Sequence, residues 1–358
     1  MGDEANLKRL LVGVNDPGGT AAMLPVVERL RKERRFRTYI IAAGHARDML
    51  SDKGISFAGT TSVISSEKAA GFFRKYRPDL LLTATSWNSN LEQQLRNRAA
   101  ALMVPSVALI DFWSNYILRF RGAEYPVKNM PDTLCVPDQN AAKEMSALGF
   151  PESRVKITGQ PFLGSLAQVE MKNRNRTKGN TFLLVSQPDV ERGGTRSSPE
   201  HLNIAARLAR ALQQSDVPPE LRIKLHPKEE KERERIIRFI KKTGRSSCEI
   251  SLLPSETDLY ECIREAEAVL GYDSMALFEA RAMNRPVFTI CKPEKGQEGL
   301  EAAMKDAGIV RFDGTAPENG TCTACESSME NFIRLHADAP QKITELLKQH
   351  VACDRKRR

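Results

Sequence analysis

The chain has 358 residues, which is too long for one ordinary hydrophobic core and predicts two domains of about 150 to 180 residues each. Its 41 % hydrophobic and 28 % charged residues are typical of a soluble globular protein and exclude a disordered chain. No apolar stretch approaches the roughly 20 residues that span a bilayer, which excludes an integral membrane protein.

The formal net charge of +9 and the terminal "DRKRR" predict attraction to polyanions such as nucleotide phosphates or anionic lipid surfaces. A peripheral membrane contact through this basic surface is one reading, and a solvated tail is the alternative. The sequence carries no aromatic-rich basic motif of an RNA-binding module, so we expect no nucleic-acid partner.

The segment "MGDEANLKRLLVGVNDPGG" places acids first and lacks a long apolar region with a cleavage site, so we expect a cytoplasmic protein. Seven cysteines, an odd number, favour reduced thiols over a disulfide framework. Cys322 and Cys325 form a CxxC without a second pair at metal-site spacing, and we expect no redox or zinc role for them.

Short apolar runs alternate with helical patterns in residues 1–161. The runs are "LKRLLVGV", "RTYIIAAG", "DLLLTAT", "PSVALID" and "DTLCVP", and the helical patterns are Ala21–Lys32, "ARDMLSDKG", Leu91–Ala101 and "AAKEMSALG". Strands that are apolar throughout and separated by helices are typical of a parallel sheet covered on both faces. Residues 1–161 are therefore predicted to form a Rossmann-like domain.

The pattern then lapses into the polar stretch "LAQVEMKNRNRTKGN", which predicts a linker over residues 162–180. A second α/β series, and with it a second Rossmann-like domain, follows over residues 181–333. It contains "TFLLVSQ", "LRIKLHP", "CEISLL", "AVLGY" and "PVFTI", with helical patterns over Pro199–Gln214, Glu229–Thr243, Thr257–Ala266 and Met275–Met283. Residues 334–358 are predicted to add a helix over Pro340–Val351 and a basic tail.

Ligands of open α/β sheets bind at the carboxyl ends of the strands, so the loops after the strands carry the candidate sites. The first loop is "NDPGGT", which contains Asp16. Gly18 and Gly19 let the backbone approach a ligand, and the helix start offers free N–H groups to an anion. An ordinary strand-to-helix turn is the alternative, since the loop matches neither GxGxxG nor a Walker motif.

Two later loops of the first domain are also candidates. "TATSWNSNLEQ" contains Glu92, and "DFWSNYILRF" gathers polar and amphipathic aromatic residues at the exit of a buried strand. The residues of the second loop are Asp111, Trp113, Asn115, Tyr116 and Arg119. Core packing rarely needs such residues there, so we expect the loop to face a ligand, with ring surfaces offered to a sugar. A buried aromatic patch that braces the loop is the alternative.

A strand ends in a Gly-x-Pro turn in "RVKITGQPFL", at the end of the first domain. This order of features resembles the GT-B glycosyltransferase superfamily. "PDTLCVPDQNAAKEMSALGFPESRVKITGQP" is similar to the corresponding stretch of lipid A disaccharide synthase, the MurG-type transferases and the UDP-N-acetylglucosamine 2-epimerases, and the resemblance covers most of residues 80–312. It implies a GT-B-like α/β fold: two Rossmann-like, doubly wound domains facing a central cleft, the first for the acceptor and the second for the nucleotide donor.

In that superfamily a histidine-proline pair and a later serine and glutamate lie on one wall of the cleft. The resemblance places the donor on His226, Pro227, Asp273, Ser274, Met275 and Glu279. Ser274 is expected to begin a helix whose N–H groups and dipole favour a diphosphate, and Glu279 to accept hydrogen bonds from both ribose hydroxyls. A simple N-cap is the alternative for Ser274.

The pair His226–Pro227 also resembles the motif of CDP-glycerol glycerophosphotransferases and bacterial polysialyltransferases, which implies contact with the donor phosphate. Because the intrinsic pKa of a histidine is about 6.5, His226 can supply a positive charge or a proton to a departing phosphate. A structural histidine that caps the next helix is the alternative.

Two departures from the related patterns restrict the function. Met275, Ala276 and a single Glu279 stand where the epimerase pattern has two glycines and paired acids, which argues against epimerisation. The loop "NDPGGT" replaces the glycine-rich first loop of MurG, so a MurG-like lipid acceptor does not follow.

The sequence thus predicts an inverting or retaining glycosyltransferase that uses a nucleotide-sugar, most simply a UDP-sugar, and a glycan, lipid-linked or small-molecule acceptor. No DxD-type cluster is evident, so we expect no metal or other cofactor. For the base that takes the acceptor's proton, Asp111 is the first candidate, Glu92 the second and Asp16 the third. The alternatives are an epimerase or hydrolase on the same fold, a transferase with a CDP-linked polyol-phosphate donor, and a non-catalytic nucleotide-sugar binder.

Overall fold

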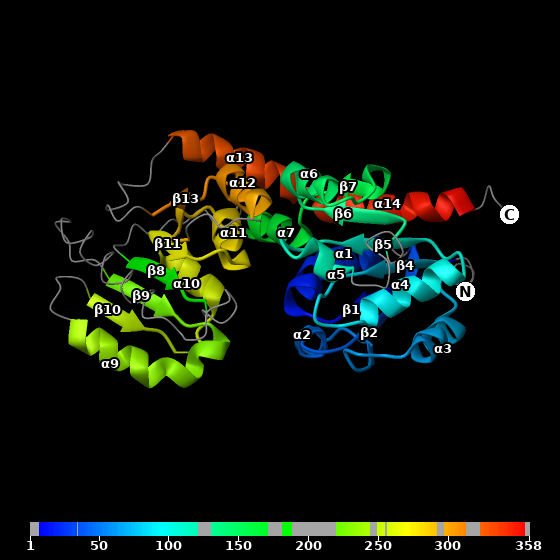
Figure 1. Ribbon diagram of the computed structural model, residues 1–358, viewed down its shortest axis with the longest axis horizontal. Helices are drawn as coiled ribbons and strands as arrows, with labels where there is room; N and C mark the ends of the chain where they lie inside the picture. The colour runs from blue at the N-terminus through cyan, green and yellow to red at the C-terminus, as the bar shows by residue number, and fades with distance from the viewer. Residues whose placement is uncertain are drawn as a thin grey trace. The chain divides into compact units, whose positions relative to one another are not determined.

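The structure is a computed structural model, and it describes residues 7–33, 35–120, 130–170, 181–187, 220–243, 249–254, 256–291, 297–312 and 323–354. The chain divides into two compact units (Figure 1). Unit 1 comprises Met1–Ser165 and Arg334–Arg358, and unit 2 comprises Leu166–Ile333. The helix predicted over Pro199–Gln214 lies outside the described residues.

Unit 1 contains a parallel sheet of seven strands in the order β3-β2-β1-β4-β5-β6-β7. The strands are β1 (Lys8–Val14), β2 (Phe36–Ala42), β3 (Ala58–Gly59), β4 (Leu80–Thr83), β5 (Ser106–Leu109), β6 (Thr133–Val136) and β7 (Val155–Ile157). The helices are α1 (Pro17–Glu33), α2 (Ala46–Asp52), α3 (Ser66–Tyr76), α4 (Leu91–Ala101), α5 (Tyr116–Arg119), α6 (Gln139–Ala147), the short 3₁₀ helix η3 (Glu152–Arg154) and α14 (Ala339–Asp354).

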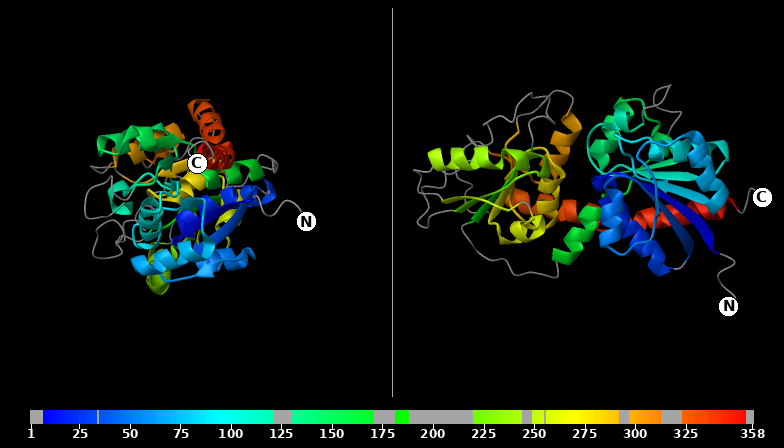
Figure 2. Two further views of the ribbon diagram at one scale, coloured as in Figure 1. Left: turned by 90° about the vertical axis from the view of Figure 1, so that its right-hand side faces the viewer. Right: turned by 90° about the horizontal axis from the view of Figure 1, so that it is seen from below.

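Helices cover both faces of this sheet (Figure 2). Because successive side chains of a strand point to opposite faces, β1 supplies both layers of the core. Leu10 and Val12 are buried with residues of α1 and α14, whereas Leu11, between them in the chain, is buried with residues of α3 and α4. The C-terminal helix α14 is thereby part of the core of unit 1.

Unit 2 contains a parallel sheet of six strands in the order β10-β9-β8-β11-β12-β13. The strands are β8 (Thr181–Val185), β9 (Glu220–Lys224), β10 (Glu249–Leu252), β11 (Ala268–Gly271), β12 (Val287–Thr289) and β13 (Val310–Arg311). The helices are the 3₁₀ helix η5 (Pro227–Glu232), α9 (Arg233–Thr243), α10 (Leu259–Glu265), α11 (Met275–Ala282) and α12 (Glu298–Asp306). Two more, α7 (Pro161–Glu170) and α13 (Thr323–Ala337), carry the chain between the units.

The strand order reverses once in each sheet. The chain runs outward from β1 through β2 to β3 and then returns to β4 on the other side of β1; in unit 2 it does the same around β8 and β11. The carboxyl ends of β1 and β4, and of β8 and β11, are therefore the topological switch points at which open α/β sheets bind ligands. This confirms the prediction of two Rossmann-like, doubly wound α/β domains.

The boundary between the two units, at Ser165 and Leu166, lies within the linker predicted over residues 162–180, but the first part of that linker is helical. Residues 162–180 begin inside helix α7, whose buried residues Leu163 and Ala167 lie one turn apart. Polar and basic residues follow this helix in the sequence. Because they dominate the composition of residues 162–180, the short apolar face of the helix was not recognised. Residues 171–180 lie outside the described residues.

Candidate functional site

Three acidic side chains gather at the switch point of unit 1. Asp16 follows β1, Asp111 follows β5, and Glu92 lies in the first turn of α4, which follows β4. These are the three residues that the sequence predicted as candidate bases. The structure brings them together because the carboxyl ends of β1, β4 and β5 are neighbours in the sheet.

The carboxyl group of Asp16 is half-buried, and its Oδ1 accepts a hydrogen bond of 2.8 Å from the Gly19 N–H. Burial raises the pKa of Asp16, and the negative charge of Asp111 raises it further. Hydrogen bonds from Gly19 and Ser86 and the charge of Arg119 act in the opposite direction without cancelling the rise. Asp16 is thus a carboxylate that holds a proton more readily than a solvent-exposed aspartate.

The two glycines of the first loop make room for these carboxylates. A Cβ atom on Gly18 would lie 2.3 Å from Asp111 Oδ2. A Cβ atom on Gly19 would lie 2.8 Å from Asp16 Oδ1 and 2.6 Å from Ala84 Cβ. The sequence predicted that the glycines allow the approach of a ligand, but in the structure the chain's own acidic side chains occupy that space.

Asp111 is held by an ion pair. Arg119 Nη1 lies 2.5 Å from Asp111 Oδ1 and also donates to the carbonyl oxygen of Thr85 at 2.9 Å. Arg119 Nε donates to the carbonyl oxygen of Ser114 at 3.0 Å. Arg119 therefore braces the loop through its contacts with Asp111, Thr85 and Ser114.

Glu92 is buried beneath this loop. Its Oε1 accepts a hydrogen bond of 2.7 Å from Ser86 Oγ, and its Oε2 lies 3.4 Å from Ser89 Oγ. Burial, together with the charge of Asp16, raises the pKa of Glu92 to about 7 despite the bond from Ser86. Ser86 Oγ donates its single proton to Glu92, and the same hydroxyl group also opposes the rise in the pKa of Asp16, so the three side chains are close neighbours.

The aromatic residues of the β5 loop correct the sequence analysis. Trp113 and Tyr116 are each only 1 % exposed, so their rings offer no surface to a sugar in unit 1. Trp113 Nε1 donates to Asp138 Oδ2 at 2.7 Å, which pins the indole into the core. Asn115 is exposed, with a positive φ of 59°, and serves as the N-terminal flank of α5. The alternative of a buried aromatic patch is therefore the one realised.

An exposed aromatic residue stands elsewhere on the same sheet edge. Trp87, in the loop after β4 and next to Ser86, is 50 % exposed. Neither Ser86 nor Trp87 was predicted as a site residue, although both lie in the quoted "TATSWNSNLEQ". The position of this loop directly after a strand was the available sign of a ligand site. The sequence alone, however, does not distinguish an exposed tryptophan such as Trp87 from a buried one such as Trp113.

The donor residues predicted in unit 2 lie at one edge of its sheet. His226 follows β9, and Asp273 and Ser274 follow β11, with β8 between these strands. Neighbouring strands are about 4.8 Å apart, so these two strand ends are separated by roughly 10 Å. The histidine-proline pair and the serine-glutamate pair thus lie on the same side of unit 2.

His226 caps the 3₁₀ helix η5, whose first residue is the exposed Pro227. His226 Nδ1 accepts a hydrogen bond of 3.2 Å from the Lys228 N–H, and Glu229 Oε2 accepts one of 3.1 Å from the His226 N–H. The capping alternative is realised in the structure. It does not conflict with phosphate contact, because an Nδ1 that accepts a bond leaves the proton of the neutral ring on Nε2, where it can be donated.

Buried oxygen atoms that have no hydrogen-bond partner among the described residues mark the switch point of unit 2. They are Ser186 Oγ and Gln187 Oε1, directly after β8, and Ser274 Oγ, after β11. Val185 and Gly271, near the ends of these two strands, are register partners. Ser274 is the N-cap of α11 by position, yet its side chain makes no capping bond, so the simple N-cap alternative is not realised. The sequence analysis missed Ser186 and Gln187, which it read as the end of a strand.

The remaining donor residues belong to α11 and the turn before it. Asp273 and Met275 flank Ser274 and are half-buried. Glu279, also half-buried, accepts a hydrogen bond of 3.4 Å from the Tyr260 hydroxyl through Oε2. Burial raises the pKa of Glu279 to about 7, although the Tyr260 bond opposes the rise.

Within the described ranges, no group of three or more histidine, cysteine, aspartate or glutamate side chains is arranged to hold a metal ion. The described helices also include none that is long and apolar enough to cross a membrane. Cys322 lies outside the described residues, and Cys325 falls in α13 where no side chain is described.

Comparison with solved structures identifies the fold. A UDP-GlcNAc 2-epimerase from Methanocaldococcus jannaschii is 14 % identical with a TM-score of 0.67, over 95 % of this chain and 99 % of that chain. UDP-GlcNAc 2-epimerase from Neisseria meningitidis, bound to UDP-GlcNAc, is 14 % identical with a TM-score of 0.61, over 95 % and 100 %. MurG from Acinetobacter baumannii is 14 % identical with a TM-score of 0.61, over 96 % and 99 %.

No protein-family model and no curated protein matches the sequence. The fold is nevertheless clear, because both units and nearly the whole chain align with these structures. The chain therefore has the GT-B fold that the resemblance in its sequence implied.

Proposed function

We propose that the protein is a glycosyltransferase that takes a sugar from a nucleotide-sugar, most simply a UDP-sugar, bound by unit 2. The observation that carries the proposal is the trio of partnerless buried oxygens, Ser186 Oγ, Gln187 Oε1 and Ser274 Oγ, at the switch point of its sheet. A buried polar atom left without a hydrogen bond destabilises a protein by about 1 to 3 kcal/mol. Their presence at the place where this fold class binds ligands favours a polar ligand that supplies the missing bonds.

The structural neighbours support a nucleotide-sugar over other polar ligands. The Neisseria meningitidis protein carries UDP-GlcNAc, and a further neighbour, from S. aureus, is a complex with UDP. In our proposal the α11 N-terminus and Ser274 receive the diphosphate, since the helix dipole favours an anion there. Glu279 has Oε1 available for the ribose hydroxyls, and His226 donates its Nε2 proton to a phosphate oxygen.

The chemistry that we propose needs a proton acceptor in unit 1. The acceptor hydroxyl attacks the anomeric carbon, the bond from that carbon to the nucleotide breaks, and the nucleotide diphosphate leaves with the bonding electron pair. The hydroxyl proton passes to a carboxylate. A base works best when its pKa lies near the working pH. Asp16, with its raised pKa and its half-buried side chain, suits this role better than Asp111, which is engaged by Arg119.

Glu92 acts on Asp16 electrostatically in this proposal. It is buried, so it has no direct access to a substrate, but its charge and that of Asp16 interact: burial raises the pKa of Glu92, and the charge of Asp16 raises it further. A single proton acceptor on one face of the sugar fits a direct displacement, which inverts the anomeric centre. The order of candidate bases therefore changes from that of the sequence analysis, with Asp16 placed first.

A nucleotide screen tests the proposed function. Ligands that bind only the folded protein raise its melting temperature, so we would compare UDP, GDP, CDP, CMP and dTDP at equal concentration. We expect UDP to give the largest shift. A larger shift with CDP or CMP would favour a CDP-linked polyol-phosphate donor, and no shift with any of the five would contradict a nucleotide-dependent enzyme.

A UDP-GlcNAc 2-epimerase or hydrolase is the second candidate, because epimerases are prominent among the structural neighbours. Met275, Ala276 and the single Glu279 still depart from the epimerase pattern. Incubation with UDP-GlcNAc and no acceptor separates the two functions. Rapid release of UDP or formation of the 2-epimer would favour the second candidate. Tight binding without turnover under any acceptor would indicate a nucleotide-sugar binder.

A further inference from the structure

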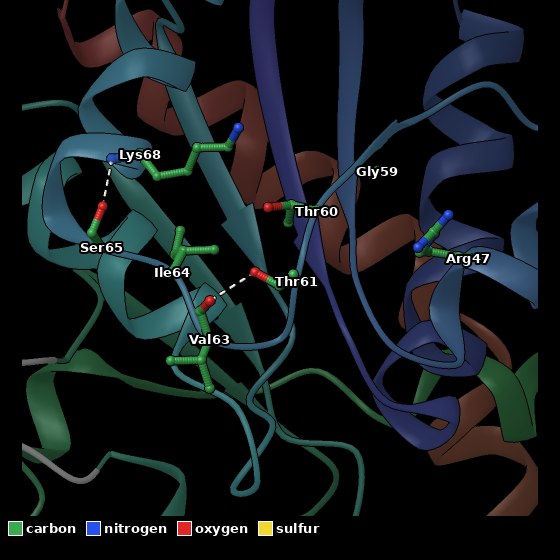
Figure 3. Close-up of a pocket in the computed structure, with 8 residues that line it drawn as sticks. All are labelled: Arg47, Gly59, Thr60, Thr61, Val63, Ile64, Ser65 and Lys68. Carbon is green, nitrogen blue, oxygen red and sulfur yellow. Dashed lines mark hydrogen bonds between the residues drawn. The ribbon is translucent and has the colours of Figure 1, made fainter.

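A pocket lies on the same edge of the unit 1 sheet as Asp16, Glu92 and Asp111, but away from these carboxylates. It has a volume of about 500 Å³ and is lined by the end of β3, the loop that follows it, the start of α3 and one residue of α2 (Figure 3). The polar side chains in its lining are those of Arg47, Thr60, Thr61, Ser65 and Lys68. No aspartate or glutamate lines it.

The two cations of this pocket are free to bind an anion. Arg47 and Lys68 come from different helices and flank the segment Gly59–Thr61 in Figure 3. Within the described part of the chain neither side chain forms an ion pair; Lys68 Nζ only lies 5.5 Å from the centre of the Phe72 ring. Glu67, the acid nearest Lys68 in sequence, is engaged by Arg74 at 2.6 Å.

Two hydroxyl groups of the pocket form hydrogen bonds within the protein, and a third forms none among the described residues. Thr61 Oγ1 donates to the carbonyl oxygen of Val63 at 2.7 Å, and Ser65 Oγ accepts from the Lys68 N–H at 3.1 Å. Thr60 is half-buried, and its hydroxyl makes no such bond among the described residues. A guanidinium, an ammonium and a hydroxyl donor together match the oxygens of a phosphate or carboxylate group.

The pocket is fixed by hydrogen bonds to the loop between β4 and α4, the helix that carries Glu92. Ser89 Oγ donates to the carbonyl oxygen of Ser62 at 2.7 Å, and the Asn90 side chain bonds both the N–H and the carbonyl oxygen of Ile64, at 2.8 and 3.1 Å. Ser89 Oγ also lies 3.4 Å from Glu92. The β3 loop and the β4 loop are therefore one hydrogen-bonded body, with the cations on one side and the carboxylates on the other.

We propose that this pocket binds an anionic group, a phosphate or a carboxylate, carried by the acceptor, so that its nucleophilic hydroxyl is presented toward Asp16. The proposal rests on the proposed transferase function for the identity of the ligand as acceptor. The binding of an anion at Arg47 and Lys68 does not depend on it. In this proposal Arg47 and Lys68 hold the acceptor anion, whereas the start of α11, Ser274 and His226 receive the donor phosphates, so the two anionic groups are bound by different residues.

The test is titration calorimetry at constant ionic strength with three probes: inorganic phosphate, glucuronate and neutral glucose. The variant is R47Q/K68Q, in which both positions are exposed and the fold should persist. The control is K75Q, which removes one positive charge outside the pocket; Lys75 lies on the same helix as Lys68, 5.1 Å from the centre of the Tyr76 ring. UDP binding is measured on all three proteins.

We expect phosphate, glucuronate or both to bind the wild type, to bind R47Q/K68Q at least about tenfold more weakly, and to bind K75Q as well as the wild type. Whichever anion binds more tightly names the acceptor group. Any phosphate held by unit 2 is unaffected by these substitutions, so the difference isolates the pocket. Equal weakening in K75Q, or no binding of either anion to the wild type, would overturn the proposal. If UDP bound to none of the three proteins, the proposed function would be overturned. The result for anion binding at Arg47 and Lys68 would remain valid in that case.

Discussion

The carboxyl group of Asp16 shows how one residue can be tuned by its neighbours. Burial and the charge of Asp111 raise its pKa, while the Gly19 N–H and Ser86 hold the carboxylate in place. Asp111 lies near it but is bound by Arg119. The two aspartates thus differ in their contacts: Asp111 is ion-paired with Arg119, whereas Asp16 is bonded to the Gly19 N–H and its pKa is raised.

Substitution of the two aspartates should separate these roles. Asp16→Asn keeps the shape of the side chain but removes the proton acceptor, so turnover should fall by roughly 10² to 10⁴ with UDP affinity intact. Asp111→Asn leaves the buried Arg119 without its counter-ion and should lower the free energy of unfolding by about 3 to 5 kcal/mol. Steady-state kinetics, UDP titration and urea denaturation measure these quantities. An Asp16→Asn variant within a few-fold of wild-type turnover would exclude Asp16 as the base.

Glu92 gives a prediction about pH. Its pKa is about 7 in the folded protein and 4.5 in its ordinary state, so the folded protein binds the proton more tightly than the unfolded chain. The stability that this proton contributes is fully present below pH 4.5 and is lost as the pH rises through about 7. Glu92→Gln removes this titration. Urea denaturation from pH 4.5 to 8 should therefore show a flatter pH profile for the variant, and an unchanged slope would contradict the raised pKa.

At the scale of elements, two short helices of unit 2 begin at the same sheet edge in different ways. The start of η5 is closed by two side chains: His226 Nδ1 accepts from the Lys228 N–H, and Glu229 Oε2 accepts from the His226 N–H. The start of α11 is left open, because Ser274 makes no capping bond. In our proposal the start of α11 receives the diphosphate, and the capped start of η5 positions Nε2 of His226.

A pair of substitutions at His226 separates capping from catalysis. Asparagine caps helices well and can accept the Lys228 N–H bond, but it lacks the Nε2 proton. His226→Asn should therefore keep the wild-type melting temperature and lose turnover. His226→Ala should lose turnover and about 1 kcal/mol of stability. Differential scanning fluorimetry beside kinetics measures both, and normal turnover in the Asn variant would assign the histidine a purely structural role.

Glu279 tests the ribose contact. Glu279→Ala removes the proposed acceptor of the ribose hydroxyls and should weaken UDP binding by about 1.5 to 3 kcal/mol. Tyr260→Phe is the matched control, since it removes the hydroxyl that bonds Glu279 Oε2 while leaving the carboxylate in place. Calorimetric titration with UDP compares the three proteins. A folded Glu279→Ala variant with wild-type affinity would show that the ribose is held elsewhere.

Three of the predicted helices match the structure closely. Helix α4 has the predicted bounds Leu91–Ala101, and α11 and α14 differ from prediction by a few residues at their ends. Helix α3 was missed, although Ser65 caps it and buried alanine and phenylalanine residues form its inner face. Helix α7 was read as a linker, since a ten-residue helix beside a polar stretch has little sequence signal of its own.

The candidate site was predicted in its positions more than in its contacts. Asp16, Glu92 and Asp111 follow three strands, and the rule that strand ends meet at one edge was enough to bring them together. The burial of Trp113 and the pairing of Asp111 with Arg119 depend on Asp138, Ser114 and Thr85, which lie far away in sequence or contribute backbone atoms. Hydrogen-bond partners of this kind leave no pattern in a single sequence.

At the scale of the whole molecule, the two units have the same plan and different contents. Each sheet has its switch point next to its first strand. In unit 1 the switch point carries carboxylates that accept hydrogen bonds from nearby residues, such as Glu92 from Ser86. In unit 2 it carries oxygen atoms that have no hydrogen-bond partner among the described residues. One unit is therefore suited to accept a proton, and the other to receive a ligand.

The most direct test of this account is UDP titration of the wild type and of a Ser186→Ala/Ser274→Ala variant, with the melting temperature of each free protein. Both hydroxyls are buried and without partners, so their removal should leave the free protein as stable as the wild type or more so. UDP affinity should fall at least about tenfold. Ser251→Ala, which removes a hydroxyl that bonds Glu220 at 3.2 Å, is the control and should not change UDP affinity. Wild-type UDP affinity in the double variant would contradict the placement of the nucleotide at the switch point of unit 2.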